Sequence, residues 1–189
     1  MKKLLTTVVL MCIAVTLHAQ ELKSPNGELV MTFALNEQGT PEYSLAYKGQ
    51  TVVRRSRLGY QLKPEDPDAP INFEFEMRGS DDSADSRSNL YSGFTVSHVS
   101  TSAFDETWRP VWGEESLIRN HYNEMAVTLR QASTSRTMVL RFRLFDSGLG
   151  FRYEFPQQAN LAYFVIKDEK TEFAMTGDHT AYWIPGDYD

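Results

Sequence analysis

Residues 139–156 read VLRFRLFDSGLGFRYEFP, and this stretch decides the fold class. Leu140, Phe142 and Leu144 alternate with more polar positions, and apolar residues return at every second position between 149 and 155. Successive side chains of a strand point to opposite faces, so a period of two predicts two β-strands, each with one buried face. Asp146-Ser147-Gly148 supplies the turn and Pro156 ends the second strand. The stretch therefore predicts an antiparallel hairpin.

The same alternation continues through most of the chain from Gly27 onward. It predicts strands at 29–35, 43–47, around 52–53, 94–98 and 125–129, and shorter ones at Phe164 and Ile166 and at Phe173 and Met175. No window of ten or more residues has the spacing of an amphipathic helix. Because only a second sheet can cover the apolar face of the first, we expect an all-β fold, a two-sheet antiparallel β-sandwich.

Residues 64–90 interrupt this rhythm. They contain eight carboxylates against Arg78 and Arg87, a local net charge of −6, and three prolines. We expect a long acidic surface excursion, with room for one strand at Phe73 and Phe75. The excursion therefore stands apart from the core strands.

A calcium loop is the functional alternative for this excursion. Asp81, Ser83 and Asp85 have its odd spacing, but Ser86 occupies the glycine position and Ser92 the position of the bidentate glutamate. A solvated loop explains the pattern better.

Overall composition excludes several protein classes. The chain has 189 residues, of which 41% are hydrophobic and 23% charged, as in ordinary globular proteins rather than disordered, collagen-like or multi-span membrane chains. Once Lys2 and Lys3 are set aside with the leader, 17 basic residues stand against 25 acidic ones, a net charge of −8. This acidity argues against a nucleic-acid partner.

The first 19 residues have the pattern of a signal peptide. Two lysines precede an uncharged, mostly apolar run from Leu4 to Leu17, and Leu17-His18-Ala19 resembles a signal-peptidase site before Gln20. We therefore expect an exported protein, periplasmic or associated with the cell envelope. The run is shorter than the roughly 20 residues of a membrane-spanning helix, so we expect no membrane span after leader removal.

Cysteine and histidine usage narrows the chemistry further. Cys12 is the only cysteine and lies in the leader, so the mature chain offers no disulfide, thiolate nucleophile or cysteine metal ligand. His98, His121 and His179 are too scattered for a zinc site. The motifs of nucleophilic hydrolases and nucleotide-binding enzymes do not occur.

Two clusters combine aromatic rings with acids and amides, at 105–124 and at 176–189. Sugar recognition uses this combination, because aromatic faces stack on the C–H faces of a pyranose and polar groups bind its hydroxyls. Tryptophans in β-sandwiches are more often core or domain-contact residues. Composition alone favours that structural interpretation and leaves both open.

These stretches also belong to a longer series of motifs. In chain order the motifs are Leu22-Lys23-Ser24-Pro25-Asn26-Gly27, Arg57-Leu58-Gly59, Phe104-Asp105-Glu106-Thr107-Trp108, Pro110-Val111-Trp112-Gly113-Glu114, Arg119-Asn120-His121-Tyr122-Asn123-Glu124, Phe151-Arg152-Tyr153-Glu154-Phe155-Pro156, Gly177-Asp178-His179-Thr180, Trp183-Ile184-Pro185 and Tyr188-Asp189. In that order they resemble the amino-terminal domain of glycoside hydrolase family 97. The acidic excursion is longer than the family pattern at its position.

The resemblance implies that residues 20–189 form a mutarotase-like supersandwich, which is a twisted two-sheet β-sandwich. It also implies that this domain packs against a catalytic (β/α)8 barrel that follows it. Family members are exported, calcium-dependent, exo-acting enzymes on α-glucosides or α-galactosides. Their catalytic carboxylates come from the barrel, and calcium positions the sugar and the catalytic acid in the complete enzyme. We assign no calcium to this chain.

A barrel needs about 250 residues, and none follow Asp189 in this sequence. We therefore predict that these residues alone do not hydrolyse glycosides and contain no catalytic residue. Trp183, Asp187 and Tyr188 are the candidates for contact with the carbohydrate in the cleft shared with the barrel.

Trp108, Trp112 and His121 are candidates for supporting the loop at the cleft or the contact with the barrel, and a structural role for all six residues stays open. Two other functions stay open. In the first, the chain is an independent carbohydrate-binding module that binds oligosaccharides through aromatics near its end. In the second, it is a docking domain that binds no sugar.

Overall fold

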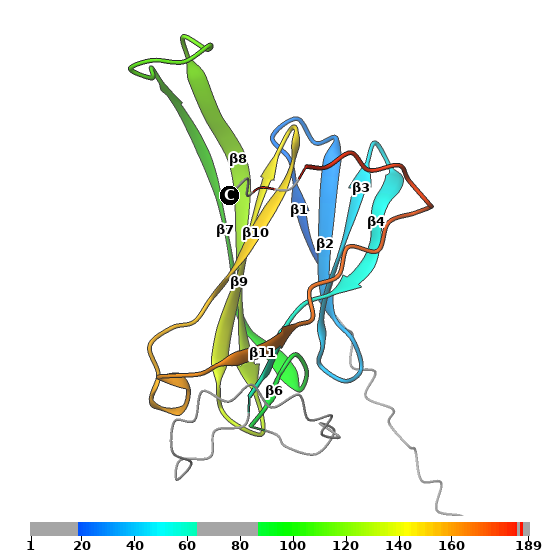
Figure 1. Cartoon of the computed structure of the whole chain (residues 1–189), viewed down its shortest axis with the longest axis vertical. Helices are drawn as coiled ribbons and strands as arrows, with labels where there is room; N and C mark the ends of the chain where they lie inside the picture. Colours follow the sequence, from blue (N-terminus) through cyan, green and yellow to red (C-terminus); the bar gives the residue numbers. More distant parts are fainter. Residues whose placement is uncertain (1–18, 64–86, 185, 187–189) are drawn as a thin grey trace, which may run out of the picture.

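Two four-stranded antiparallel sheets face each other in the computed structural model, which describes residues 19–63, 87–184 and 186 (Figure 1). The first sheet has the order β1-β2-β3-β4, from β1 (Gln20–Lys23), β2 (Leu29–Leu35), β3 (Pro41–Tyr47) and β4 (Gln50–Arg57). The second has the order β10-β9-β8-β7, from β7 (Phe94–Trp108), β8 (Ile118–Gln131), β9 (Thr137–Phe145) and β10 (Gly148–Glu154). The predicted all-β sandwich is confirmed.

A small third sheet lies at one end of the sandwich (Figure 1). Its order is β11-β5-β6, from β11 (Ile166–Glu169), β5 (Tyr60–Leu62) and β6 (Asn89–Leu90). A 3-10 turn (Ala159–Leu161) precedes β11. Beyond β11, the strand expected at Phe173 and Met175 is reduced to one bridge between Met175 and Val53. The chain there lies against β4 without forming a regular strand.

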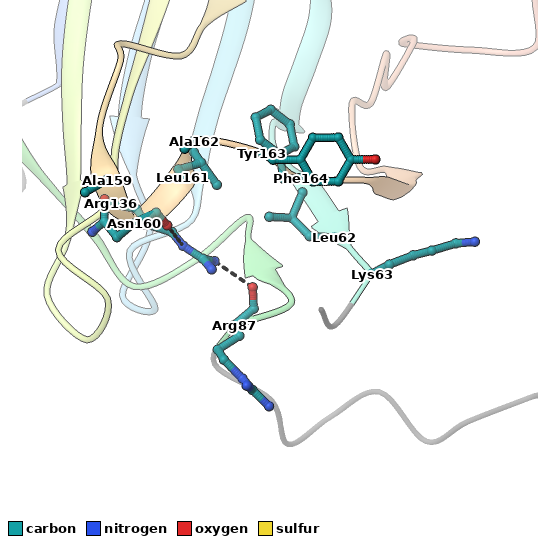
Figure 2. A pocket seen from close by; sticks show the side chains of 10 residues that line it. All are labelled: Leu62, Lys63, Arg87, Arg136, Ala159, Asn160, Leu161, Ala162, Tyr163 and Phe164. Atoms are coloured by element: carbon teal, nitrogen blue, oxygen red, sulfur yellow. Dashed lines mark hydrogen bonds between the residues drawn. The ribbon is translucent and has the colours of Figure 1, made fainter. Parts of the chain in front are cut away.

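A cavity of about 380 Å³ lies beside this third sheet (Figure 2). The 3-10 turn and β5 line it, and Arg136 donates from Nη1 to the Arg87 carbonyl at 2.6 Å across it. Lys63 is the last described residue before 64–86, and Arg87 is the first one after it. The strand expected at Phe73 and Phe75 therefore lies outside the described residues.

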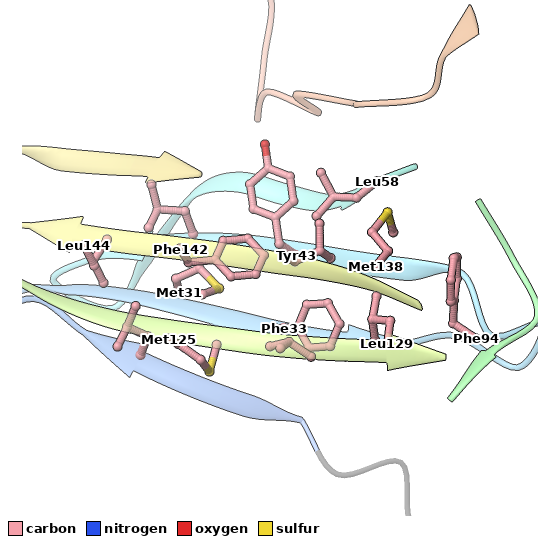
Figure 3. Close-up of a cluster of buried hydrophobic side chains, with 14 of the residues drawn as sticks. Met31, Phe33, Tyr43, Leu58, Phe94, Met125, Leu129, Met138, Phe142 and Leu144 are labelled. Atoms are coloured by element: carbon pink, nitrogen blue, oxygen red, sulfur yellow. The ribbon is translucent and has the colours of Figure 1, made fainter. Parts of the chain in front are cut away.

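The hydrophobic core fills the space between the two large sheets (Figure 3). Leu140, Phe142 and Leu144 are each 0% exposed, so the inward face expected for this strand is confirmed. Phe142 meets Phe33 of the opposite sheet with ring centroids 6.0 Å apart. Removing these side chains from water is the main force that holds the sheets together.

The outer face of the second sheet carries an ion-pair ladder. Arg141 of β9 donates from Nε and Nη2 to Glu154 of β10, at 2.6 and 3.0 Å, and also donates to Glu124 of β8. These side chains lie on the same face because every second residue of a strand points to the same side of the sheet. The Arg141 hydrogen bonds are the main cause that lowers the pKa of Glu154 to about 2.

Gly59 explains why the connection between β4 and β5 needs a glycine. Its φ is +140°, a conformation that L side chains rarely adopt, and an added Cβ would lie 2.5 Å from the Cα of Tyr91. Leu58, beside it, is fully buried. The motif Arg57-Leu58-Gly59 thus turns the chain from the first sheet into the third.

Candidate functional site

The β7–β8 hairpin projects beyond the rest of the sandwich (Figure 1). β8 pairs with β9 only between Asn123 and Arg130, whereas its pairing with β7 continues as far as Trp108 and Ile118. The far end of the hairpin therefore has no third strand beside it among the described residues. Sequence reasoning identified 105–124 as an aromatic and acidic cluster but missed that most of it forms two paired strands.

Large apolar side chains gather in the open at the end of this hairpin. Trp108 is 48% exposed and Trp112 is 87% exposed. Val111, Leu117 and Ile118 are exposed beside them. Exposed apolar groups that share one small region indicate a contact surface. The end of the hairpin thus fits the contact role expected for the two tryptophans.

Polar and aromatic contacts stiffen the hairpin below that end. Arg119 donates from Nε and Nη2 to the two oxygens of Asp105, each at 2.8 Å. These hydrogen bonds lower the pKa of Asp105. His121 lies opposite Asp105 in the register, not at the apolar end. His121 is thus half-buried in the paired part of the hairpin and does not form its exposed end.

A ring cluster marks the point where the hairpin leaves the sandwich. Tyr122 stacks on Phe104 with centroids 5.2 Å apart and meets Phe145 at 5.1 Å. The guanidinium of Arg143 lies 4.6 Å from the centroid of the Tyr122 ring, within the range of a cation–π contact. This packing holds the projecting strands to the second sheet.

The carboxyl-terminal segment carries a second group of exposed aromatics. Trp183 is 80% exposed, with Tyr182 and Ile184 exposed beside it. In the view of Figure 1 this segment crosses the sandwich in the half from which the hairpin projects. Among the described residues, no hydrogen bond or ring contact joins Trp183 to the hairpin tryptophans. Asp187 and Tyr188, the other two candidates for sugar contact, lie outside the described residues.

A groove of about 570 Å³ lies between β10, β5 and the chain that follows β11. The groove-lining rings come from three segments, namely Tyr60, Phe151, Tyr153, Phe155 and Phe173, and the polar members are Arg152, Glu169 and Thr171. β10 is the edge of its sheet, so its apolar face is only partly covered. The sequence predicted the apolar face of β10 to be core. Because β10 is an edge strand, part of that face instead forms the floor of the groove.

The groove aromatics are packed in one continuous row. Tyr60 lies 4.5 Å from Tyr153 and 5.9 Å from Phe155 between ring centroids, and Phe151 lies 6.1 Å from Phe173. Such separations are typical of attractive aromatic pairs. The row is therefore a preformed surface.

Two tyrosine hydroxyls are held in the groove in their neutral form. Burial, with a smaller contribution from the charge of Glu169, raises the pKa of Tyr60 to about 12. The hydroxyl of Tyr153 accepts the Gly59 N–H at 3.0 Å and pairs with the Thr171 hydroxyl at 2.7 Å. Neutral hydroxyls both donate and accept hydrogen bonds.

The described part of the chain shows neither a metal centre nor a membrane span. Within residues 19–63, 87–184 and 186, no three or more His, Cys, Asp and Glu side chains lie close enough together to hold an ion. In the same residues no helix is long and apolar enough to cross a bilayer. The described residues therefore fit no calcium cage, and no catalytic step is assigned to such an ion.

Comparison with known proteins identifies relatives of the whole sandwich. The family described as Glycosyl-hydrolase 97 N-terminal matches residues 22–189. Two solved structures of a Glycoside Hydrolase Family 97 enzyme from Pseudoalteromonas sp. strain K8, one in complex with panose and one with acarbose, are each 32% identical to the chain, with a TM-score of 0.70. Each match covers 88% of this chain and 22% of that enzyme.

A further structure shares the fold alone. A β-arabinopyranosidase is 20% identical with a TM-score of 0.64, over 82% of this chain and 21% of that one. The chain thus spans about a fifth of the length of the enzymes it resembles.

Proposed function

Since the chain belongs to the Glycosyl-hydrolase 97 N-terminal family, we propose that it is the sandwich of an exported α-glycosidase that packs against a catalytic (β/α)8 barrel and completes its active site. The observation that carries this proposal is the match over residues 22–189 to a part that makes up 22% of much larger enzymes. The remaining length of those enzymes is ample for a barrel of about 250 residues.

The projecting hairpin supports a docking role. Its end exposes Trp108 and Trp112 to water. A contact with another domain would bury these apolar rings and so be favourable. The ring cluster around Tyr122 fixes the direction in which the hairpin projects. A rigid arm with an apolar end is suited to hold a second domain in one orientation.

The chemistry of bond cleavage is assigned to the barrel. We expect its carboxylates to act as acid and as base or nucleophile, with calcium in the complete enzyme as the ion that positions the sugar. α-Glucosides are the first substrates to test, because the related enzyme is seen with panose and with acarbose; α-galactosides are the second. Trp183, Asp187 and Tyr188 are proposed to face the shared cleft.

The test is an activity measurement on the protein made from the complete reading frame, compared with residues 1–189 produced alone. We expect the former to hydrolyse panose or an α-galactoside, to lose activity with a calcium chelator and to regain it with added calcium. We expect the 189 residues alone to be inactive. The proposal is contradicted if the complete protein hydrolyses no α-glucoside or α-galactoside, or if the 189 residues alone do.

The exposed Trp183 supports a second candidate, an independent carbohydrate-binding module. If a pyranose stacks on this ring, the Trp183→Ala change should weaken the binding free energy by about 1 kcal/mol or more. Calorimetric titration with maltooligosaccharides and α-galactosides measures that change, with Tyr163→Ala as the control because Tyr163 is an exposed ring elsewhere on the sandwich. If neither sugar class gives heat, this second function is excluded.

A further inference from the structure

We propose that the groove between β10, β5 and the chain after β11 binds a neutral saccharide. The inference goes beyond the docking role, because the groove residues belong to the body of the sandwich and not to the hairpin end. Its volume of about 570 Å³ lies within the range of about 300–1,000 Å³ that is usual for small-molecule sites. The space alone would suit many ligands, and the chemistry of the lining selects among them.

The floor of the groove offers aromatic faces. Phe173 is 63% exposed at the rim, and Phe151 and Tyr153 of β10 and Phe155 directly after it are half-buried. Pyranose rings present flat C–H faces that pack on such rings, whereas a strongly charged ligand would lose its hydration there. The packed row keeps these faces in place before any ligand arrives.

The rim offers the hydrogen-bonding groups that sugar hydroxyls need. Glu169 uses Oε1 to accept the Thr171 hydroxyl at 2.7 Å, and no described residue donates to its other oxygen. Tyr60, whose pKa is raised to about 12, keeps a hydroxyl that can donate or accept at neutral pH. Two hydroxyls of a ligand can therefore bind Glu169, which accepts a hydrogen bond, and Tyr60, which donates or accepts one.

The charges of the groove favour an uncharged ligand. Glu169 contributes a carboxylate to its lining, whereas the guanidinium of Arg152 is engaged with Glu154 through Nε at 2.8 Å on the outer face of the sheet. An anionic ligand would meet the Glu169 carboxylate, and any charged ligand would lose hydration against the aromatic rings. A neutral polyhydroxylated molecule avoids both costs and uses Glu169 as a hydrogen-bond acceptor.

The test titrates the purified protein with panose, maltotriose and melibiose by calorimetry, and maps the contacts by saturation-transfer NMR. Phe173→Ala removes the exposed face and should weaken binding at least about fivefold. Tyr60→Phe removes only a hydroxyl and should weaken binding without changing the melting temperature. Tyr163→Ala, an exposed ring outside the groove, is the control and should bind as the unmodified protein does.

Two results would overturn the inference. One is the absence of binding with all three sugars. The other is binding that survives both Phe173→Ala and Tyr60→Phe but disappears in Trp183→Ala, which would place the sugar on the carboxyl-terminal segment. Neither result depends on hydrolysis by the complete protein, so failure of the groove and failure of the docking role are told apart.

Discussion

The two halves of β8 differ in sequence and in surroundings, since 118–124 is mostly polar and 125–131 carries four apolar residues. Met125, Val127 and Leu129 are at most 1% exposed, whereas Ile118 at the other end of the strand is exposed. The difference lies in what faces the strand: the first sheet covers the inner half, and no described strand except β7 accompanies the outer half. An apolar residue in a strand is therefore buried only where a second layer exists to cover it.

The largest effect should come from the covered half. Phe142→Ala removes a fully buried ring that contacts both sheets and should lower the free energy of unfolding by about 3–5 kcal/mol. Phe104→Ala, a ring at the root of the hairpin, is the matched control and should cost clearly less. Denaturant unfolding of both variants measures the difference. Equal losses would show that the hairpin is as much part of the core as the sandwich.

An intermediate effect should appear as a dependence of stability on pH. The pKa of Glu154 falls from 4.5 to about 2 in the folded chain. Its ionised form therefore stabilises the fold above about pH 4.5, and this contribution is lost as the pH falls toward 2. Glu154→Gln cannot titrate, so the stability difference between the unmodified protein and this variant should shrink over that window.

Arg141→Met provides the second arm of this experiment. It removes the main cause of the lowered pKa and should remove the same part of the pH dependence. Unfolding curves at several pH values measure both variants. A stability difference that stays constant from pH 5 to pH 2 would contradict the assigned role of the ladder.

The smallest effect on stability should come from the hairpin end. Trp112→Ala removes a side chain that is 87% exposed, so the free energy of unfolding should change by no more than about 0.5 kcal/mol. In the complete protein the same change should make the sandwich easier to separate from its neighbour, measured as faster limited proteolysis between them. A large loss of stability in the isolated sandwich would mean that the ring is packed rather than free.

Local alternation predicted much of the fold. The turn predicted at Asp146-Ser147-Gly148 joins β9 to β10, whose pairing starts with Gly148 opposite Phe145. The pairing of β11 with β5 could not be foreseen, because it joins Ile166–Glu169 to Tyr60–Leu62 across a long stretch of chain. Alternation reports which face of a strand is apolar but not which distant strand lies next to it.

The candidate site was predicted in part. Trp112 and Trp183 were singled out from their aromatic and acidic neighbours, and both are exposed. The groove was missed because Phe151 and Tyr153 carry the same pattern as core residues. The carbohydrate roles of Asp187 and Tyr188 stay predictions.

The sequence by itself determined the class of fold, the inward face of the strand that carries Leu140, Phe142 and Leu144, and the family. It could do so because side-chain periodicity and turn chemistry are local properties of the chain. Only the tertiary structure decided which apolar residues stay in contact with water. Burial depends on strand order and on the length of each pairing, so the hairpin end and the edge strand β10 expose rings that the pattern alone assigns to a core.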